Sequence, residues 1–423
     1  MQHYGFENQK DIQLSETNFS RTEKKQIEQE IMRRLRTQML MLGWIIIPIV
    51  AVAVWFLKPQ PAVEKLAAKS AATTVLAKKV GKPTPPTSTL AIAATTTTNP
   101  TTFQKDATDT IFFVGVGDMA FNGQIADTLR YNGAQDIFSD ITQVLQSGDV
   151  VVGDLESPLS MGSQTSATGR STVLGAPEAA TGMRNAGINL VSLANDHIMD
   201  YGTAGLINTV NRLNQVGIAH AGAGNNSQQA YTRTVLNIKG KKVALLSLSS
   251  IAPDNARAQE GKAGIAANKK RYYIDSLIKE AAKQNDYLIV SCHWGDEGST
   301  GIQNSQRKFA KRAIDAGADV VLGSHPHMMQ GIEIYNGRCI AYSPGNFIYP
   351  SGSGNSGQAF VLKLSLAKGM IIKAEVVPIS VDPSGKPSLA TGCAAGAILQ
   401  KLKNMSDPLA TNVNIVGNTA QVT

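Results

Sequence analysis

The sequence has little cysteine. Its 423 residues include only three, Cys292, Cys339 and Cys393, which are too few and too scattered to form a disulfide framework or a zinc ribbon. Cys292 and Cys339 lie in apolar runs and are predicted to be small buried hydrophobic residues. Because usable thiols are scarce, a site for a soft metal ion is disfavoured.

Nucleic-acid binding is not expected, because the sequence lacks the basic helix and the aromatic-basic motifs of proteins that bind nucleic acids. The net charge of +8 comes mainly from residues 58–105, which contain seven Lys or Arg and one Glu. These residues form a linker of Ala, Thr, Pro and Lys that is unable to make a core. The charge suits contact with anionic lipid headgroups or with a polyanionic polymer, and it equally suits simple solubilisation of a stalk.

Long apolar runs are also rare, and the one exception is residues 39–57, which read MLMLGWIIIPIVAVAVWFL. These nineteen uncharged residues are enough to span a bilayer. Three arginines between residues 33 and 36, together with Trp44 and Trp55 near the ends, favour a transmembrane helix over a buried core helix. The run is too long and starts too late for a cleaved signal peptide. We predict a single-pass protein of the cell membrane, with residues 1–38 as a cytoplasmic tail and the main domain outside.

From residue 106 onward, short apolar runs alternate with amphipathic segments, which is typical of a layered α/β domain. The short polar stretch Lys239-Gly240-Lys241 joins two apolar runs and predicts a hairpin, so the sheet should be mixed. We expect the domain to cover 106–385 and residues 386–423 to be peripheral. The expected strands are 111–116, 149–153, 188–193, 231–238, 242–248, 286–292, 319–323, 331–335, 338–343, 358–366 and 371–378. The expected helices are 122–130, 136–147, 177–186, 203–216, 270–284 and 303–316.

Polar side chains that could bind a metal follow several of these apolar runs. His325 and His327 come directly after the run that ends at Leu322, and in an extended segment their imidazoles would point the same way. Two more of the six histidines, His197 and His293, also follow apolar runs. Strand ends at the carboxyl edge of a sheet are a common place for ligand sites. The carboxylates that occupy similar positions are Asp118, Asp154 and Glu156.

Carboxylate and neutral imidazole together suit Zn, Mn, Fe or Mg, and we expect one or two such divalent ions. Two ions bridged by a carboxylate would suit a phosphoester substrate. Taken singly, Asp118 could equally be a helix cap, Asp154 a turn residue and Glu156 a cap of the turn before Pro158. His220 is predicted to be structural. It is the convergence of several strand ends that favours the metal site.

Several motifs occur in order between residues 110 and 380. They are Val116-Gly117-Asp118, Asp154-Leu155-Glu156-Ser157-Pro158-Leu159, Ala194-Asn195-Asp196-His197 with Asp200-Tyr201-Gly202, His293-Trp294-Gly295, Gln306, Gly323-Ser324-His325-Pro326-His327 and Tyr342-Ser343-Pro344-Gly345-Asn346-Phe347. In sequence and order these motifs resemble those of the CapA family. The resemblance implies a metallophosphatase-like four-layer α/β/β/α sandwich and a role in making or exporting poly-γ-glutamate capsule. A membrane-anchored protein facing outward, with an anionic polymer and capsule synthase subunits as partners, is also implied.

The resemblance also implies roles for individual residues. Asp154 or Glu156 would bridge the metals. Asp196 and His197 would match a catalytic Asn-His pair, and Asn195 and Asn346 would bind substrate, although Asn346 could equally serve a left-handed turn. The implied metal ligands are Asp118, Asp154, Glu156, Asp196, His293, His325 and His327.

This chain departs from the family pattern at a few positions. Ala120 stands where a second ligand is expected after Asp118, which would weaken or remove one metal site. Asp196 replaces the usual Asn and adds a negative charge that could weaken phosphate binding. Ser324 and Pro344 also differ, without removing a ligand. Two hypotheses follow: a metal-dependent, phosphoesterase-like hydrolase, and a noncatalytic subunit that binds a polyanion within a capsule synthesis and export complex.

Overall fold

The computed structural model describes residues 109–162, 172–268, 271–350, 357–367 and 370–423. The predicted tail, membrane span 39–57 and linker 58–105 lie outside these residues. The described part of the chain contains no helix that is both long and apolar enough to cross a membrane. All of it belongs to the second of two compact units, residues 96–423.

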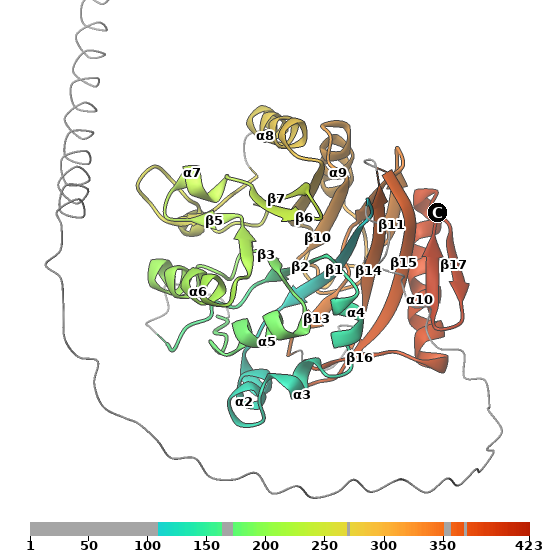
Figure 1. Cartoon of the computed structure of the whole chain (residues 1–423), viewed down its shortest axis with the longest axis horizontal. Coiled ribbons are helices and arrows are strands. Elements are labelled where there is room, and N and C mark those ends of the chain that lie inside the picture. The colour runs from blue at the N-terminus through green and yellow to red at the C-terminus, as the bar shows by residue number, and fades with distance from the viewer. Residues whose placement is uncertain (1–108, 163–171, 269–270, 351–356, 368–369) are drawn as a thin grey trace, which may run out of the picture. The chain divides into compact units, whose positions relative to one another are not determined.

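Two large sheets form the centre of the domain (Figure 1). The first sheet has ten strands in the order β17-β18-β15-β14-β1-β2-β3-β4, with β13 added beside β1 and β16 beside β15. Its strands are β1 (Ile111–Met119), β2 (Val150–Leu155), β3 (Leu190–Ser192), β4 (Ala219–Ala221), β13 (Asn346–Ile348), β14 (Gln358–Ala367), β15 (Met370–Val381), β16 (Pro387–Leu389), β17 (Val413–Val416) and β18 (Thr419–Val422).

The second sheet has six strands in the order β11-β12-β10-β9-β7-β6. They are β6 (Thr234–Ile238), β7 (Lys241–Ser249), β9 (Tyr287–His293), β10 (Val320–Ser324), β11 (Ile332–Tyr335) and β12 (Arg338–Ala341). A separate pair joins β5 (Ala223–Gly224) to β8 (Gly264–Ile265). Both sheets are mixed, since β14 pairs antiparallel with β1 while β2 pairs parallel with it. The predicted mixed α/β fold is confirmed.

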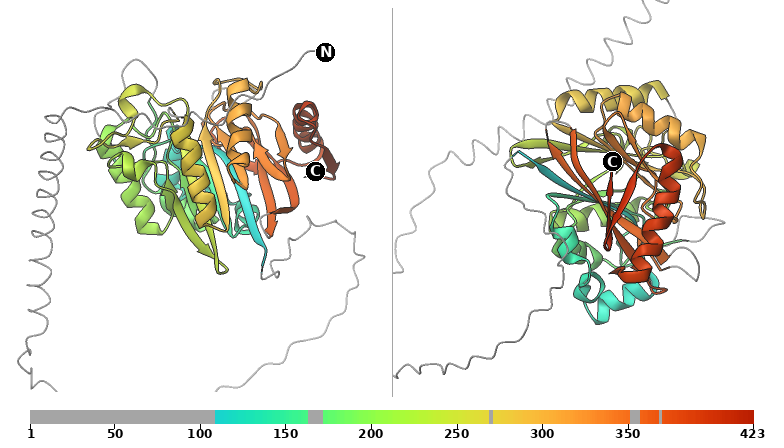
Figure 2. Two further views of the ribbon diagram at one scale, coloured as in Figure 1. Left: turned by 90° about the horizontal axis from the view of Figure 1, so that it is seen from above. Right: turned by 90° about the vertical axis from the view of Figure 1, so that its right-hand side faces the viewer.

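Helices cover the outer faces of the two sheets. The first sheet packs against α2 (Gly123–Tyr131), α3 (Ala134–Phe138), α4 (Thr142–Gln146), α5 (Ala179–Ala186) and α6 (Gly202–Val216). The second sheet packs against α8 (Arg271–Gln284) and α9 (Asn304–Asp315). The right panel of Figure 2 shows α8 and α9 on one side of the strands and α2 and α3 on the other. Short helices α7 (Ser227–Ala230), η1 (Asp254–Ala256) and η3 (Asp407–Leu409) complete the domain with α10 (Gly392–Ser406).

Successive side chains of a strand point to opposite faces of its sheet, so the apolar side chains are divided between separate cores. On β1, Ile111 and Phe113 face the second sheet, whereas Val114 and Val116 face the helices. Residues from β9 and β10, such as Ile289 and Leu322, fill the layer between the sheets from the other side. The described residues are therefore layered helix, sheet, sheet, helix.

The hairpin predicted at Lys239-Gly240 is present between β6 and β7, with φ of 50° and 76° at its two central residues. Positive φ at both positions is typical of a type I′ turn. The helix expected over 136–147 is instead divided into α3 and α4. At the division, Ser139 and Asp140 form a side-chain hydrogen bond of 3.0 Å, and short polar side chains of this kind compete with helical backbone bonds.

Residues 386–423 were expected to be peripheral, and this expectation is wrong. Helix α10 buries Ile398, Leu399 and Leu402 in the apolar layer between the sheets, and β18 pairs with β15. The apolar pattern is weak here because α10 begins with the small residues Gly-Cys-Ala-Ala-Gly and its large apolar residues come late. The domain thus extends to the last residues of the chain.

Candidate metal centre

The predicted ligands come from strand ends in both sheets. Asp118 on β1 lies beside Asp154 on β2, and His293 on β9 lies beside Ser324 at the end of β10. Gly117 allows β1 to approach the turn before β13, because a Cβ at this position would lie 1.7 Å from the carbonyl oxygen of Gly345. The polar residues at the ends of these strands therefore lie in one region, to which both sheets contribute.

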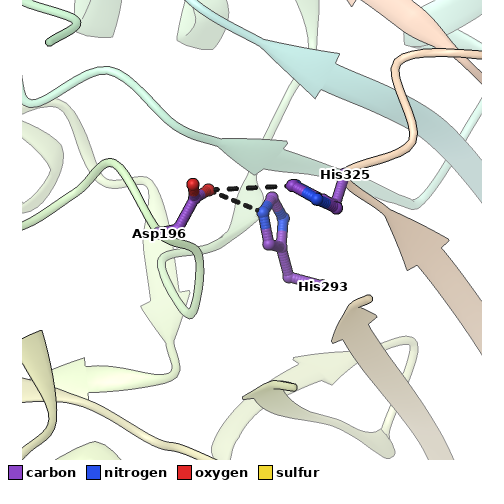
Figure 3. A group of neighbouring side chains, drawn as sticks. All are labelled: Asp196, His293 and His325. Carbon is purple, nitrogen blue, oxygen red and sulfur yellow. Dashed lines mark hydrogen bonds and ion pairs between the residues drawn. The ribbon is translucent and has the colours of Figure 1, made fainter. Parts of the chain in front are cut away.

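One group of metal-binding side chains consists of Asp196, His293 and His325 (Figure 3). The Oδ1 atom of Asp196 lies 2.9 Å from Nε2 of His293 and 4.0 Å from Nδ1 of His325. The two imidazole rings are tilted, with their centroids 4.7 Å apart. Figure 3 shows the carboxylate facing both rings, so one cation could be bound by all three side chains.

A second group consists of Asp118, Asp154, Glu156 and His293, whose donor atoms all lie within 4.8 Å of one another. Asp154 Oδ2 lies 2.7 Å from His293 Nδ1 and also accepts a hydrogen bond from the Ser324 hydroxyl. His293 belongs to both groups, which makes them neighbours. Two neighbouring cations could lie here, with His293 as a ligand of one of them, because a neutral imidazole has one free ring nitrogen.

Several donor atoms in these groups are buried and have no hydrogen-bond partner. They are Oδ2 of Asp118, both carboxylate oxygens of Glu156 and Nδ1 of His325. Buried polar atoms without a partner cost free energy, and native proteins rarely contain several in one place. A divalent cation would supply the missing partner for oxygen and imidazole nitrogen alike. The residues present therefore fit the metal ions that the sequence predicts.

Burial and mutual charge strongly shift the pKa values in this cluster. Burial raises the pKa of Glu156 well above its usual range; the charge of His327 opposes this shift, and the charge of Asp118 adds to it. Burial alone would lower the pKa of His327, but Glu156 and Asp118 raise it to about 10. Burial and the charge of His293 lower the pKa of His325 to about 3. Such opposed shifts are typical of functional sites.

The HPH segment reaches the cluster through an unusual backbone. His325 and His327 have φ of 93° and 56°, so they do not lie in the extended segment that was expected. That expectation was wrong because β10 ends at Ser324 and the chain bends there. The backbone N–H of His325 donates to Oδ1 of Asp118 at 3.1 Å. Positive φ in a residue with a side chain is strained, and such strain is concentrated at functional sites.

His197 lies at the edge of the first group and belongs to neither set of donors. Its Nδ1 is 2.8 Å from Oδ2 of Asp200, and its Nε2 is 3.8 Å from Oδ2 of Asp196. Asp200 is fully buried and also accepts a hydrogen bond from the backbone of Val173. Because a carboxylate accepts hydrogen bonds, this contact holds the proton on Nδ1 and turns Nε2 toward the cluster.

The two asparagines predicted to bind substrate are both buried beside the cluster. Asn195 donates to Oδ1 of Asp154 and to the carbonyl of Leu155. The Oδ1 atom of Asn346 lies 2.8 Å from Nδ1 of His327. Both side chains thus support residues of the metal centre, and their predicted role in substrate binding stays a prediction.

Sequence reasoning left two residues of the site without a role. Asp200 belongs to the motif Asp200-Tyr201-Gly202. Its position three residues after His197 could have marked it as a partner of that histidine. Tyr349 was not singled out, although its ring centroid lies 4.5 Å from that of His327. No pattern in the sequence marks it. His220, predicted to be structural, lies on β4 and belongs to neither group of donors.

Comparisons with known proteins give a consistent result. Residues 110–351 match the model of the family described as bacterial capsule synthesis protein PGA_cap. The chain is 27% identical over 268 residues to the PGA biosynthesis protein CapA of Bacillus subtilis, covering 63% of this chain and 70% of that protein. It is 26% identical over 286 residues to the capsule biosynthesis protein CapA of Bacillus anthracis, covering 65% and 68%.

Among solved structures, the chain is similar to a putative 5′-nucleotidase from Staphylococcus aureus, with 13% identity and a TM-score of 0.41. It is also similar to the NAD nucleotidase of Haemophilus influenzae, with 12% identity and a TM-score of 0.35. Each match covers 70% of this chain. The chain spans 58% and 56%, respectively, of these two solved chains.

Proposed function

Because the chain belongs to the bacterial capsule synthesis protein family PGA_cap, we propose that it acts in the synthesis or export of a poly-γ-glutamate capsule. The names of the two Bacillus relatives, a PGA biosynthesis protein and a capsule biosynthesis protein, support this role. We assign the work to a metallophosphatase-like domain. Its metal centre would act on a phosphoester, on an amide or on the growing polymer.

One observation carries the proposal of a metal-dependent activity. The two carboxylate oxygens of Glu156 are buried without a hydrogen-bond partner, next to Asp118 and Asp154. Asp118, Asp154 and Glu156 would hold one divalent ion and Asp196 and His325 another, with His293 as a ligand of one of the two, because a neutral imidazole has one free ring nitrogen. His327, whose Nε2 lies 4.0 Å from Glu156, is a further ligand candidate. A divalent ion bound in either group would act as a Lewis acid toward an oxygen of the substrate.

The chain's own residues would supply proton transfer and orientation. Asp200 holds Nδ1 of His197, so proton exchange with the substrate would occur at Nε2, on the side of Asp196. Asn195 holds Asp154 through a hydrogen bond of 3.0 Å, and Ser324 holds the other oxygen of the same carboxylate. These two contacts fix the orientation of the Asp154 carboxylate, a candidate metal ligand that is bonded to residues of both sheets.

A second function is favoured by Ala120. This residue is fully buried after Asp118, and its methyl group offers no ligand where the family pattern expects one. A metal centre weakened in this way would suit a noncatalytic subunit that binds a polyanion within a capsule synthesis and export complex. In that case the basic linker 58–105 would carry much of the binding.

One experiment with the full chain separates the two functions. Hydrolysis of a generic phosphodiester and of poly-γ-glutamate would be measured with and without added Mn²⁺ or Zn²⁺. For an enzyme, His197→Ala abolishes the metal-dependent turnover and leaves polymer binding intact, while Lys→Gln changes in the linker leave turnover unchanged. For a scaffold, the linker changes reduce polymer binding and no turnover is found in any variant.

We also propose that the protein is anchored in the cell membrane by residues 39–57, with its main domain outside. The apolar run and the preceding arginines support this orientation. Protease added to intact cells should release a fragment that contains residues 109–423. If that fragment is protected in intact cells and cleaved only after lysis, the proposed orientation is wrong.

A further inference from the structure

Two buried glutamines form a hydrogen-bonded pair beside the connection from β9 to α9. Gln306 lies in the first turn of α9, and Gln330 follows the HPH turn, residues 324–327. The Nε2 atom of Gln306 donates to Oε1 of Gln330 at 3.0 Å. The Oε1 atom of Gln306 accepts a hydrogen bond of 2.8 Å from the backbone N–H of Gln303. The pair is therefore anchored to the start of α9.

Gln330 binds the loop of residues 295–301, which leads from β9 to α9. Its Nε2 atom donates to the backbone carbonyl oxygens of Ser299 and Gly301, at 3.1 and 3.0 Å. Most residues of this loop are exposed. Because little of the loop is fixed by burial, these two hydrogen bonds determine its position, and the bond from Gln306 fixes the amide that makes them.

The loop in turn contacts the HPH turn. The backbone N–H of Gly298 donates to the carbonyl of Pro326 at 2.9 Å. That carbonyl belongs to the planar peptide unit between Pro326 and His327, so the bond orients the backbone at His327. On the other side of the proline, the N–H of His325 donates to Asp118. Both histidines have positive φ, which persists only where the surrounding structure holds the backbone.

We propose that Gln306 and Gln330 are positioning residues of the metal centre. Through the 295–301 loop they hold the HPH turn, and with it the imidazoles of His325 and His327, in place. This role rests on the proposed metal-dependent function, because the two histidines serve there as candidate ligands. The glutamines act through the backbone of the loop and the turn, so their loss should disturb the site without removing a donor atom.

The test replaces each glutamine by methionine in the full chain, singly and together. Methionine is similarly long and unbranched but makes no amide hydrogen bond. Gln306→Met leaves the bonds from Gln330 to the loop in place and removes the bond that orients its amide. It should therefore show the same changes as Gln330→Met in weaker form, and it carries the test if Gln330→Met does not fold.

Asn189→Ala is the matched control. The amide of Asn189 also joins two backbone positions, since it donates to the carbonyl of Asp149 at 2.8 Å and accepts from the N–H of Val151 at 2.9 Å. These residues lie at the starts of β2 and β3, opposite the strand ends that carry the predicted ligands. The control thus removes comparable hydrogen bonds far from the HPH turn.

Hydrogen exchange is measured first, on metal-free protein, by mass spectrometry of peptides that contain Gly298 and His325. We expect both regions to exchange at least about 10-fold faster in Gln330→Met than in wild type, because the bonds that hold the loop and the turn are lost. Peptides from the interiors of β9 and β10 should keep their wild-type rates. Unchanged exchange at His325, or equally faster exchange throughout the strands, would overturn the assignment.

Affinity for Mn²⁺ is then measured by competition with a fluorescent chelator. Gln330→Met should bind Mn²⁺ about 10- to 100-fold more weakly, as expected when a residue that supports a ligand is lost. Because the two glutamines act in series, the double variant should lose no more than Gln330→Met alone. Asn189→Ala should keep the wild-type affinity and exchange. Wild-type affinity in Gln330→Met, or losses that add in the double variant, would contradict the proposed role.

The two proposals fail in different ways. If the wild-type chain binds metal and the methionine variants change neither the exchange at His325 nor the affinity, the role of the glutamines is refuted while the metal centre stands. If the wild-type chain binds no metal, the proposed function is refuted, and the role of the glutamines falls with it.

Discussion

At the residue scale, two buried glutamates show how differently the fold treats a carboxylate. Glu333 accepts hydrogen bonds from Arg307 and from the Tyr342 hydroxyl and lies 2.9 Å from Lys311. These partners lower its pKa despite burial. Glu156 is also fully buried, but its oxygens have no hydrogen-bond partner and its pKa is raised. Glu333 forms structural ion pairs, whereas Glu156 has the surroundings expected of a metal ligand.

Glu156→Gln should therefore act in opposite directions on the two forms of the protein. In the metal-free form it removes a poorly compensated buried charge and should raise the free energy of unfolding at pH 8 by about 1–3 kcal/mol. In the metal-loaded form it should weaken metal binding at least tenfold. Urea unfolding with and without a chelator measures both effects. Glu333→Gln is the control and should destabilise both forms, whereas a loss of stability in metal-free Glu156→Gln would contradict this account.

The pKa shifts also predict how stability depends on pH. Glu156 and His327 both have folded-state pKa values above their unfolded values, so each stabilises the fold at low pH and loses that contribution as pH rises. For His327 the loss lies between about 6.5 and about 10. The lowered pKa of His325 affects the stability of the fold only at pH values below this window. Metal-free protein should thus unfold at lower temperature at pH 9 than at pH 7, and saturating Mn²⁺ should remove the difference. Equal melting temperatures without metal would contradict this.

Asn346 provides another prediction, about a residue that supports a ligand. Its Oδ1 atom fixes the proton on Nδ1 of His327 and leaves Nε2 facing Glu156. Asn346→Ala should weaken metal affinity about 10- to 100-fold, as expected when a residue supporting a ligand is removed. Asn404→Ala is the control, since Asn404 is exposed on α10. Competition with a fluorescent chelator measures the affinity, and equal values for the two variants would remove Asn346 from the metal centre.

At the element scale, the strands were the easiest part of the fold to predict. Runs such as Tyr287–Cys292 are mostly apolar because their strands are buried on both faces, and a polar residue at the end marks the edge of the sheet. The turn after β10 was not predictable, because nothing in Ser324-His325-Pro326-His327 indicates positive φ at two histidines. Several of the predicted side chains do lie close together, and their role as ligands stays a prediction, whereas the expected extended segment was wrong.

Helix α10 was missed for a physical reason and supplies a test at the same scale. It buries Leu399 completely in the layer between the sheets, while the neighbouring Gln400 is exposed. Leu399→Ala should lower the free energy of unfolding by about 2–5 kcal/mol, as is typical of a buried leucine. Gln400→Ala should change it by less than about 0.5 kcal/mol. Chemical denaturation of both variants measures the difference, and similar small values would mean that α10 is dispensable.

At the scale of the whole molecule, the metal centre is formed where two sheets meet. The first sheet contributes Asp118, Asp154 and Glu156, and the second contributes His293 and the HPH turn. The sequence could identify these residue types and their strand ends, because each signal is local. It could not identify Tyr349, because its position depends on how β13 pairs with β1 and on where the second sheet lies.

The most direct test of the central claim is the metal content of the purified full chain, measured by elemental analysis. His293 belongs to both donor groups, Asp196 to one, and His220 to neither. We predict about two divalent ions per wild-type chain, about one or fewer in His293→Ala, about one in Asp196→Ala, and no loss in His220→Ala. A wild-type chain without bound metal, or a His293→Ala variant with full metal content, would contradict the account.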